Sequence, residues 1–381
     1  MSRPQWPLLH KNTQALAEAD DPHARARLLA DRVGLLARHG FVSHAIALLP
    51  EARDAVLELD DGEAFVRLAI SEAITVYYDP GATRSLEVFD TALEAAHEHG
   101  LPELAAEAAI WAATYRRTRG VDSIGAIEHT RFALQHAGPA CETTLARAVF
   151  LAGIFFAVVG LADEAQQCHR DAMRLARRAE DIQLCDAIAT YPLLIEVNNA
   201  RAAHAAGSLS ESASDKLEQR LRAAASRRSY AAKRAQIHIH LGEALRLRGR
   251  YAEAAKLLSL YLPQSEAEGA ANAELLVSRS DRAVCLLHLH DGRAAAQERS
   301  NLHNALAGQM THYWRGALLT NLAEIEQLLG RPEAAGRFST QAAEAWARRE
   351  RDNAEFRVAL ERADLFSCWK ATPRLFLVSQ R

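Results

Sequence analysis

Histidine is the residue type in this sequence that first suggests chemistry, because the 381-residue chain contains 16 of them. Three pairs have the form His-x-His, namely His97/His99, His238/His240 and His288/His290. Residues two apart on a helix point about 200° away from each other, so the two members of a pair cannot bind the same ion. We therefore expect histidines on helix surfaces or in grooves, and predict no metal site and no cofactor.

Motifs for catalysis are absent from the sequence. None of the five lysines follows a glycine, which excludes the phosphate-binding GxxxxGK loop, and GxGxxG, HExxH and GxSxG are missing as well. Glutamates are spread along the whole chain, so no pair of carboxylates stands out as an acid and base couple. We predict a protein that acts by binding and not by catalysis, and a helical enzyme is the least favoured alternative.

The composition indicates helices throughout. Alanine, leucine, arginine and glutamate dominate, whereas valine and isoleucine are sparse. The net charge of −3 implies no general attraction to nucleic acid or to a membrane. The five cysteines are widely spaced without a CxxC, and the sequence has neither a signal-peptide core nor an apolar run of about 18 residues. We expect a cytoplasmic protein with reduced thiols.

The stretch Gln236–Leu262, QIHIHLGEALRLRGRYAEAAKLLSLYL, predicts two helices joined by a tight turn. Apolar residues recur at three- and four-residue intervals on both sides of Gly249, which is the residue type that best tolerates the left-handed conformation after a helix. Gly242 on the first helix and Ala254 on the second are small, as close packing of two helices requires. This hairpin is the clearest copy of a repeat.

The repeat resembles the tetratricopeptide repeat in its order Leu241-Gly242, Leu245, Gly249, Tyr251 and Ala254. Two further copies keep the spacing: Gly153 and Ala165 flank Gly160, and Ala323 and Ala335 flank Gly330. Extended repeats of this kind resemble the helical sensor domains of bacterial signalling proteins, such as maltose-type transcriptional activators, Rap-like regulators and segments that precede diguanylate cyclase domains.

Candidate turn glycines recur along the chain at intervals between 38 and 47 residues: Gly40, Gly81, Gly120, Gly160, Gly207, Gly249, Gly292 and Gly330. The resemblance therefore implies an all-α, right-handed superhelical solenoid of about eight antiparallel helix pairs over residues 23–365. Residues 1–22 are expected to form an N-terminal extension, and residues 366–381 an irregular tail. A docking strand, or a chain shortened relative to relatives with an effector domain, remains open for the tail.

In tetratricopeptide proteins the first helices of the pairs line a concave groove. Carried over to this sequence, the pattern predicts eight groove residues: Asn198, Arg201, Glu243, Arg246, Arg279, Arg282, Asn321 and Glu324. Arginines and asparagines suit the carboxylates and backbone amides of an extended peptide. The resemblance thus implies a non-catalytic scaffold that binds a protein or peptide segment, or alternatively a ligand- or partner-sensing regulatory domain of a bacterial signalling system.

Charge is unevenly distributed along the chain. Residues 51–107 contain fourteen acidic residues against three arginines, whereas residues 216–250 contain ten basic residues against two acidic ones. Solvated helix faces explain such runs without any partner. The alternatives are a basic patch that holds an acidic partner and head-to-tail contact in a homo-oligomer, while nucleic-acid binding is disfavoured because few aromatic residues interleave the basic ones.

Overall fold

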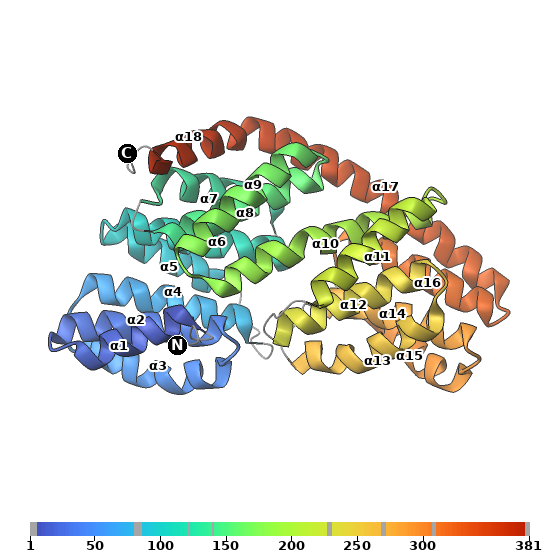
Figure 1. Cartoon of the computed structure of the whole chain (residues 1–381), viewed down its shortest axis with the longest axis horizontal. Coiled ribbons are helices and arrows are strands. Elements are labelled where there is room, and N and C mark those ends of the chain that lie inside the picture. The colour runs from blue at the N-terminus through green and yellow to red at the C-terminus, as the bar shows by residue number, and fades with distance from the viewer. Residues whose placement is uncertain are drawn as a thin grey trace. The chain divides into compact units, whose positions relative to one another are not determined.

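The computed structural model describes residues 6–79, 86–119, 122–138, 141–226, 231–267, 272–306 and 310–377. Within these ranges every regular element is a helix, which confirms the all-α class (Figure 1). Eight consecutive helix pairs are preceded by α1 (Pro7–Glu18) and followed by α18 (Leu365–Leu377). The pairs are α2 (Pro22–Arg38) with α3 (Val42–Leu57), α4 (Gly62–Tyr78) with α5 (Glu87–Glu98), α6 (Pro102–Arg119) with α7 (Ser123–His136), α8 (Glu142–Val158) with α9 (Ala162–Arg178), α10 (Ile182–Ala205) with α11 (Glu211–Ala225), α12 (Ala231–Leu247) with α13 (Tyr251–Ala267), α14 (Asn272–His288) with α15 (Gly292–Ala305), and α16 (His312–Leu328) with α17 (Pro332–Arg362).

In most pairs, the first helix is followed by a residue in the left-handed backbone conformation. Five of the predicted turn glycines have positive φ angles there: Gly40, Gly160, Gly207, Gly249 and Gly330. Gly81 and Gly120 lie outside the described residues. The prediction for Gly292 is wrong, because this residue begins α15 and His290 takes the left-handed conformation instead, with φ 62°.

Small residues allow the two helices of a pair to approach. A Cβ atom on Gly242 would lie 2.9 Å from Cγ of Leu258, and one on Gly153 would lie 2.8 Å from Cβ of Cys168. Ala165, Ala254, Ala323 and Ala335 are buried as well. The residues that carry the tetratricopeptide pattern are therefore buried, and Gly242 and Gly153 leave no room for a larger side chain.

The described helices form two compact units. Unit 1 comprises the residues up to Ile188 together with those from Phe356 onward, and unit 2 comprises Ala189–Glu355. In unit 1, α8 is buried along almost its whole length, as its apolar sequence predicts. The end of α2 reaches the start of α10, where Arg38 pairs with Asp181 across 143 residues of sequence. Unit 1 therefore winds back upon itself.

Unit 2 is held together by apolar side chains from successive pairs. Leu193 and Val197 of α10 pack with Leu217 and Leu221 of α11 and with residues of α12 and α13. A second cluster joins α14, α15 and α16 and extends to Phe338 and Trp346 of α17. Each pair thus packs mainly against its neighbours in sequence, as expected for a repeat protein.

The C-terminal segment differs from the irregular tail that the sequence predicts, because α18 continues to Leu377. Trp369 of this helix is only 4% exposed and its ring lies 6.0 Å from that of Phe156. Thr372 donates a hydrogen bond to the carbonyl oxygen of Leu134 on α7. The helix forms because its aromatic side chains find an apolar surface on α7 and α8, which no local sequence signal reveals.

Candidate functional site: a buried polar cluster in unit 2

The first helices of four pairs in unit 2 carry a polar residue at the same place. Asn198, His240, Asp281 and Asn321 each lie nine positions before the left-handed residue that ends α10, α12, α14 and α16, respectively. Equivalent positions on stacked helices face the same side of a repeat array. These residues therefore mark one polar face that runs across all four helices, and we call the group of side chains around it the polar cluster.

Arg201 and Asp281 form a bidentate pair within the polar cluster. Nη1 and Nη2 of Arg201 donate to Oδ1 and Oδ2 of Asp281 at 2.9 and 2.6 Å, in the bidentate geometry that favours arginine. Asp281 Oδ1 also accepts from the side-chain amide of Asn321 at 2.8 Å. The same amide donates to the hydroxyl of Ser280, so Asn321 is fixed by two partners on α14.

Arg246 extends the polar cluster toward its edge. Its guanidinium donates to the side-chain oxygen of Asn321 at 3.0 Å and to the carboxylate of Glu324. Its Nε atom lies 3.5 Å from Asp281 Oδ1. Arg246 is 3% exposed as a residue, whereas the side chain of Glu324 is 30% exposed, so Glu324 is accessible to solvent where Arg246 is not.

Glu243 occupies the other end of the polar cluster. Its carboxylate accepts from Ser278 at 2.5 Å and lies 3.0 Å from Nδ1 of His240 and 3.3 Å from Arg201. Burial by itself would raise the pKa of Glu243, but the attraction of Arg201 and the contacts with His240 and Ser278 outweigh burial and hold the pKa below its ordinary value. Glu243 is therefore a buried carboxylate anion.

Tyr313 links α16 to α10, which are the last and the first of the four helices that carry the polar cluster. Its hydroxyl donates to the side-chain oxygen of Asn198 at 2.7 Å, which joins α16 to α10 across 115 residues of sequence. Burial raises the pKa of Tyr313 well above its usual range, so the hydroxyl keeps its proton and acts as a donor. The guanidinium of Arg349 lies 5.4 Å from the centre of the Tyr313 ring.

The structure brings together six of the eight residues that the tetratricopeptide pattern predicts for the groove: Asn198, Arg201, Glu243, Arg246, Asn321 and Glu324. Arg279 and Arg282 are not among them. Arg279 pairs with Glu266 of α13, and Arg282 pairs with Glu298 of α15 at 2.7 Å. Whether any of the eight side chains binds a peptide stays a prediction.

Sequence reasoning missed five members of the polar cluster: His240, Ser278, Ser280, Asp281 and Tyr313. In α14 the sequence pattern selected Arg279 and Arg282, whereas the residue nine positions before the left-handed His290 is Asp281. The recurrence of Asn198, His240, Asp281 and Asn321 at intervals of 40 to 42 residues is the signal that could have identified the correct face.

Three buried nitrogens of the polar cluster have no hydrogen-bond partner among the described residues: Nε of Arg201, Nε2 of His240 and Nε of Arg246. Each is a donor or acceptor that would gain from a further polar group. The cluster combines two arginines with the carboxylates of Glu243, Asp281 and Glu324. The polar cluster can therefore form hydrogen bonds with a ligand that carries amide groups and charged groups of either sign.

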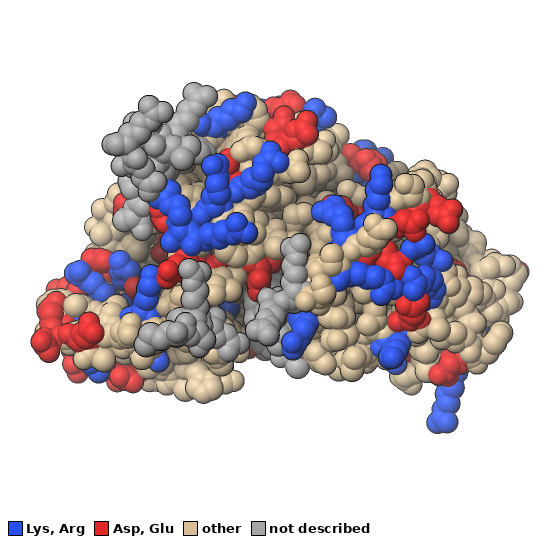
Figure 2. Space-filling model, viewed as in Figure 1, with Lys and Arg blue, Asp and Glu red and all other residues tan. Residues whose placement is uncertain are grey.

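The described residues also bear on metal binding, membrane insertion and surface charge. They contain no group of three or more histidine, cysteine or acidic residues that could hold a metal ion, and none of their helices is long and apolar enough to cross a membrane. In the basic stretch of unit 2, Arg248, Arg250 and Arg222 converge on Glu218. Figure 2 shows basic and acidic side chains interleaved on the visible face of this unit, which favours the interpretation as a solvated surface.

Comparison with known proteins finds no matching family model and no matching curated protein. Among solved structures, a Rap protein complexed with Competence and Sporulation Factor is similar with a TM-score of 0.55 and 12% identity, over 93% of this chain and 97% of that chain. A circular tandem repeat protein with a novel repeat topology aligns with 98% of this chain and 91% of that chain, at 15% identity and a TM-score of 0.21. The Rap protein is a tetratricopeptide-like helical-repeat protein. The fold expected from the residues around Gly249 is therefore confirmed, and this chain has a tetratricopeptide-like helical-repeat fold.

Proposed function

We propose that this protein is a non-catalytic scaffold that binds an extended peptide segment at the polar cluster of unit 2. The observation that carries the proposal is the convergence of polar side chains from α10, α12, α14 and α16 on one connected network. A peptide that crosses these helices would meet arginines suited to its carboxylates and asparagines suited to its backbone amides.

The energetics of the polar cluster support a binding role. A buried network of ion pairs is often no more stabilising than apolar side chains of the same volume, because removing charges from water is costly. A chain selected for stability alone would fill the space between these helices with leucine or valine. The presence of Arg201, Arg246 and Asp281 there is better explained by a ligand that uses them.

Binding would proceed by exchange of partners. The cluster side chains pair with one another in the unliganded protein, and an entering peptide would replace part of these pairs with its own groups. Asn198 and Glu324 are partly exposed and would be met first, whereas Arg201 is 4% exposed and would be reached only after the helices move apart. Because each pair packs mainly on its neighbours, small rotations between pairs would add up to that movement.

Selection of peptides from a random display library on the purified protein tests the proposal. Hydrogen exchange measured with and without a selected peptide should show protection in α10, α12, α14 and α16. Protection confined to other helices would mean that the peptide binds elsewhere.

The second candidate function is a cytoplasmic, bacterial regulatory sensor that passes a binding event to a partner protein. It is supported by the similarity over 93% of this chain to a Rap protein solved with Competence and Sporulation Factor bound. The two functions differ in one observable property. In a sensor, the selected peptide should change the affinity for a partner protein several-fold, whereas in a plain scaffold the peptide itself is the partner.

A further inference from the structure

Unit 1 contains a buried arginine, Arg147, with no hydrogen-bond acceptor among the described residues. Arg147 of α8 is 9% exposed, and no described residue of the unit forms an ion pair or a hydrogen bond with it. It stacks on Trp111 of α6, where the guanidinium carbon lies 3.9 Å from the centre of the ring. A buried charged group is costly unless it is paired, so this arrangement calls for an explanation.

A second guanidinium faces the same aromatic ring. The guanidinium carbon of Arg38 lies 5.9 Å from the centre of the Trp111 ring. Arg38 pairs with Asp181 and also donates to the side-chain oxygen of Gln183. Glu107 of α6 also acts on Arg38, so Arg38 has acidic groups near it, whereas Arg147 has no hydrogen-bond acceptor among the described residues.

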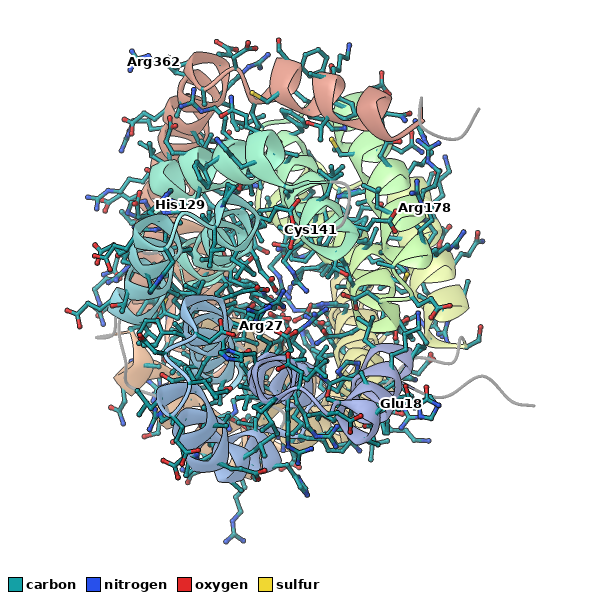
Figure 3. The ribbon with its side chains drawn as sticks, turned by 90° about the vertical axis from the view of Figure 1, so that its left-hand side faces the viewer. Glu18, Arg27, His129, Cys141, Arg178 and Arg362 are labelled. Carbon is teal, nitrogen blue, oxygen red and sulfur yellow. The ribbon has the colours of Figure 1, made fainter. Side chains whose placement is uncertain are left out.

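Both charged and aromatic groups lie around Arg147. The groups that influence it are Arg38 of α2, Tyr77 and Tyr78 of α4, and Asp181 at the start of α10. Burial, followed by repulsion from Arg38, lowers the pKa of Arg147 below its ordinary value. Burial raises the pKa of Tyr78, so its phenol stays neutral. Figure 3 shows the helices of unit 1 with their side chains as sticks.

We propose that unit 1 binds the carboxylate group of a ligand between Arg147 and Arg38, beside the ring of Trp111. A carboxylate would give the guanidinium of Arg147 the acceptor that no described residue provides, and the planar fork of a guanidinium matches its two oxygens. Trp111 holds Arg147 in place by stacking, and Tyr77 and Tyr78 add aromatic surface whose rings lie 5.9 and 6.2 Å from that of Trp111. The site lies in the other unit from the polar cluster and does not depend on the peptide-binding proposal.

The carboxylate could belong to the C-terminus of a peptide or to a small organic acid. N-acetylphenylalanine stands for the first source and benzoate for the second, and N-acetylphenylalanine amide is the neutral control. A ligand that binds only the folded protein raises the midpoint of thermal unfolding, by an amount that grows with the logarithm of its concentration above the dissociation constant. At constant ionic strength, we expect one or both acids to raise the midpoint of the wild-type protein and the amide to leave it unchanged.

Replacement of the arginine makes the test specific. Arg147→Met keeps the length of the side chain and removes the charge, so the effect of the acids on the unfolding midpoint should disappear. The midpoint without ligand should stay the same or rise, because an unpaired buried charge is gone. Arg177→Met removes one charge from an exposed position of α9 and should preserve the full effect of the acids.

Two results would overturn the proposal. One is an equal response of the wild-type and Arg147→Met proteins to the acids, and the other is the absence of any response in the wild-type protein. If Arg147→Met does not fold, Arg147→Lys decides the matter, because it keeps the charge but loses the planar fork. It should then bind the acids at least tenfold more weakly than the wild-type protein, and unchanged binding would contradict the assignment.

Discussion

Arg201 of α10 and Asp281 of α14 lie 80 residues apart in sequence and form two parallel hydrogen bonds of 2.9 and 2.6 Å. The intervening pair, α12 and α13, does not separate them, because α12 contributes Glu243 and Arg246 to the same polar cluster. Three successive first helices of unit 2 are thus tied together by side chains that are almost inaccessible to solvent.

This arrangement predicts that single replacements in the Arg201 and Asp281 pair are costly. Asp281→Asn or Arg201→Met should each lower the free energy of unfolding by about 3–5 kcal/mol, because each leaves a buried charge without its partner. The double variant should lose less than the sum of the two. Urea denaturation of all four proteins gives the coupling free energy.

The control for this prediction is Arg220→Met. Arg220 pairs with Glu196, and the side chains of both residues are at least 35% exposed. Surface pairs contribute little, so the cost should stay within about 0.5 kcal/mol. Equal costs for Arg201→Met and Arg220→Met would show that the buried pair is not formed as described.

The second prediction concerns two glycines, whose replacement should change the free energy of unfolding in opposite directions. Gly242→Val should lower the free energy of unfolding by about 2–4 kcal/mol, because even a Cβ atom would lie 2.9 Å from Leu258 and force the two helices of the pair apart. Gly336 lies within α17 with nothing within 4 Å of an added Cβ atom, so Gly336→Ala should raise stability by about 0.5–1 kcal/mol. Chemical denaturation measures both changes.

The lowered pKa of His169 predicts that the free energy of unfolding depends on pH. Burial lowers the pKa of His169 from 6.5 to about 4, and its Nε2 atom has no hydrogen-bond partner among the described residues. Between these two values the unfolded chain binds a proton that the folded protein does not, so the free energy of unfolding falls as the pH decreases from 6.5 toward 4. The contribution of this group reaches at most about 3 kcal/mol.

Comparison of variants isolates this contribution from that of the other titrating groups. Between pH 7.5 and pH 4.5, the wild-type protein should lose about 2 kcal/mol more stability than His169→Gln, which cannot take up the proton. His44→Gln, at an exposed position, serves as the control. Parallel pH profiles for the wild-type protein and His169→Gln would refute the buried, neutral state of His169.

The burial of Trp369 predicts that α18 contributes to the stability of unit 1. Trp369→Ala removes a side chain that is 4% exposed and packs on Phe156, so it should cost about 3–5 kcal/mol. Thermal unfolding followed by circular dichroism measures the change. A cost below about 1 kcal/mol would mean that α18 detaches readily from α7 and α8.

Much of the fold could be predicted from the sequence because the repeat has local signals. Gly249, Gly160 and Gly330 mark turns by their left-handed conformation, and Gly242 and Gly153 mark the tight contact within a pair. These features depend only on a few neighbouring residues. The helix α18 could not be predicted in the same way, because its apolar face is covered by helices more than 200 residues earlier in the chain.

The candidate site could be predicted in part. The spacing from Gly207, Gly249 and Gly330 places residues of α10, α12 and α16 on the inner face, and six of them do meet. The prediction fails in α14, where the left-handed residue is His290 and not a glycine. Nor does the sequence reveal that Arg201 and Arg246 are paired with carboxylates from distant helices, since that depends on how the pairs stack.

Binding of a selected peptide to matched variants tests the central claim most directly. Fluorescence anisotropy with a labelled peptide from the display selection measures the affinity of the wild-type protein and of Asn198→Ala, Glu324→Gln and Arg279→Ala. Asn198 and Glu324 belong to the polar cluster and are partly exposed, so their variants should fold and bind at least tenfold more weakly. Arg279 pairs with Glu266 outside the cluster, and its variant should bind as the wild-type protein does. Unchanged affinity in both cluster variants would contradict the account.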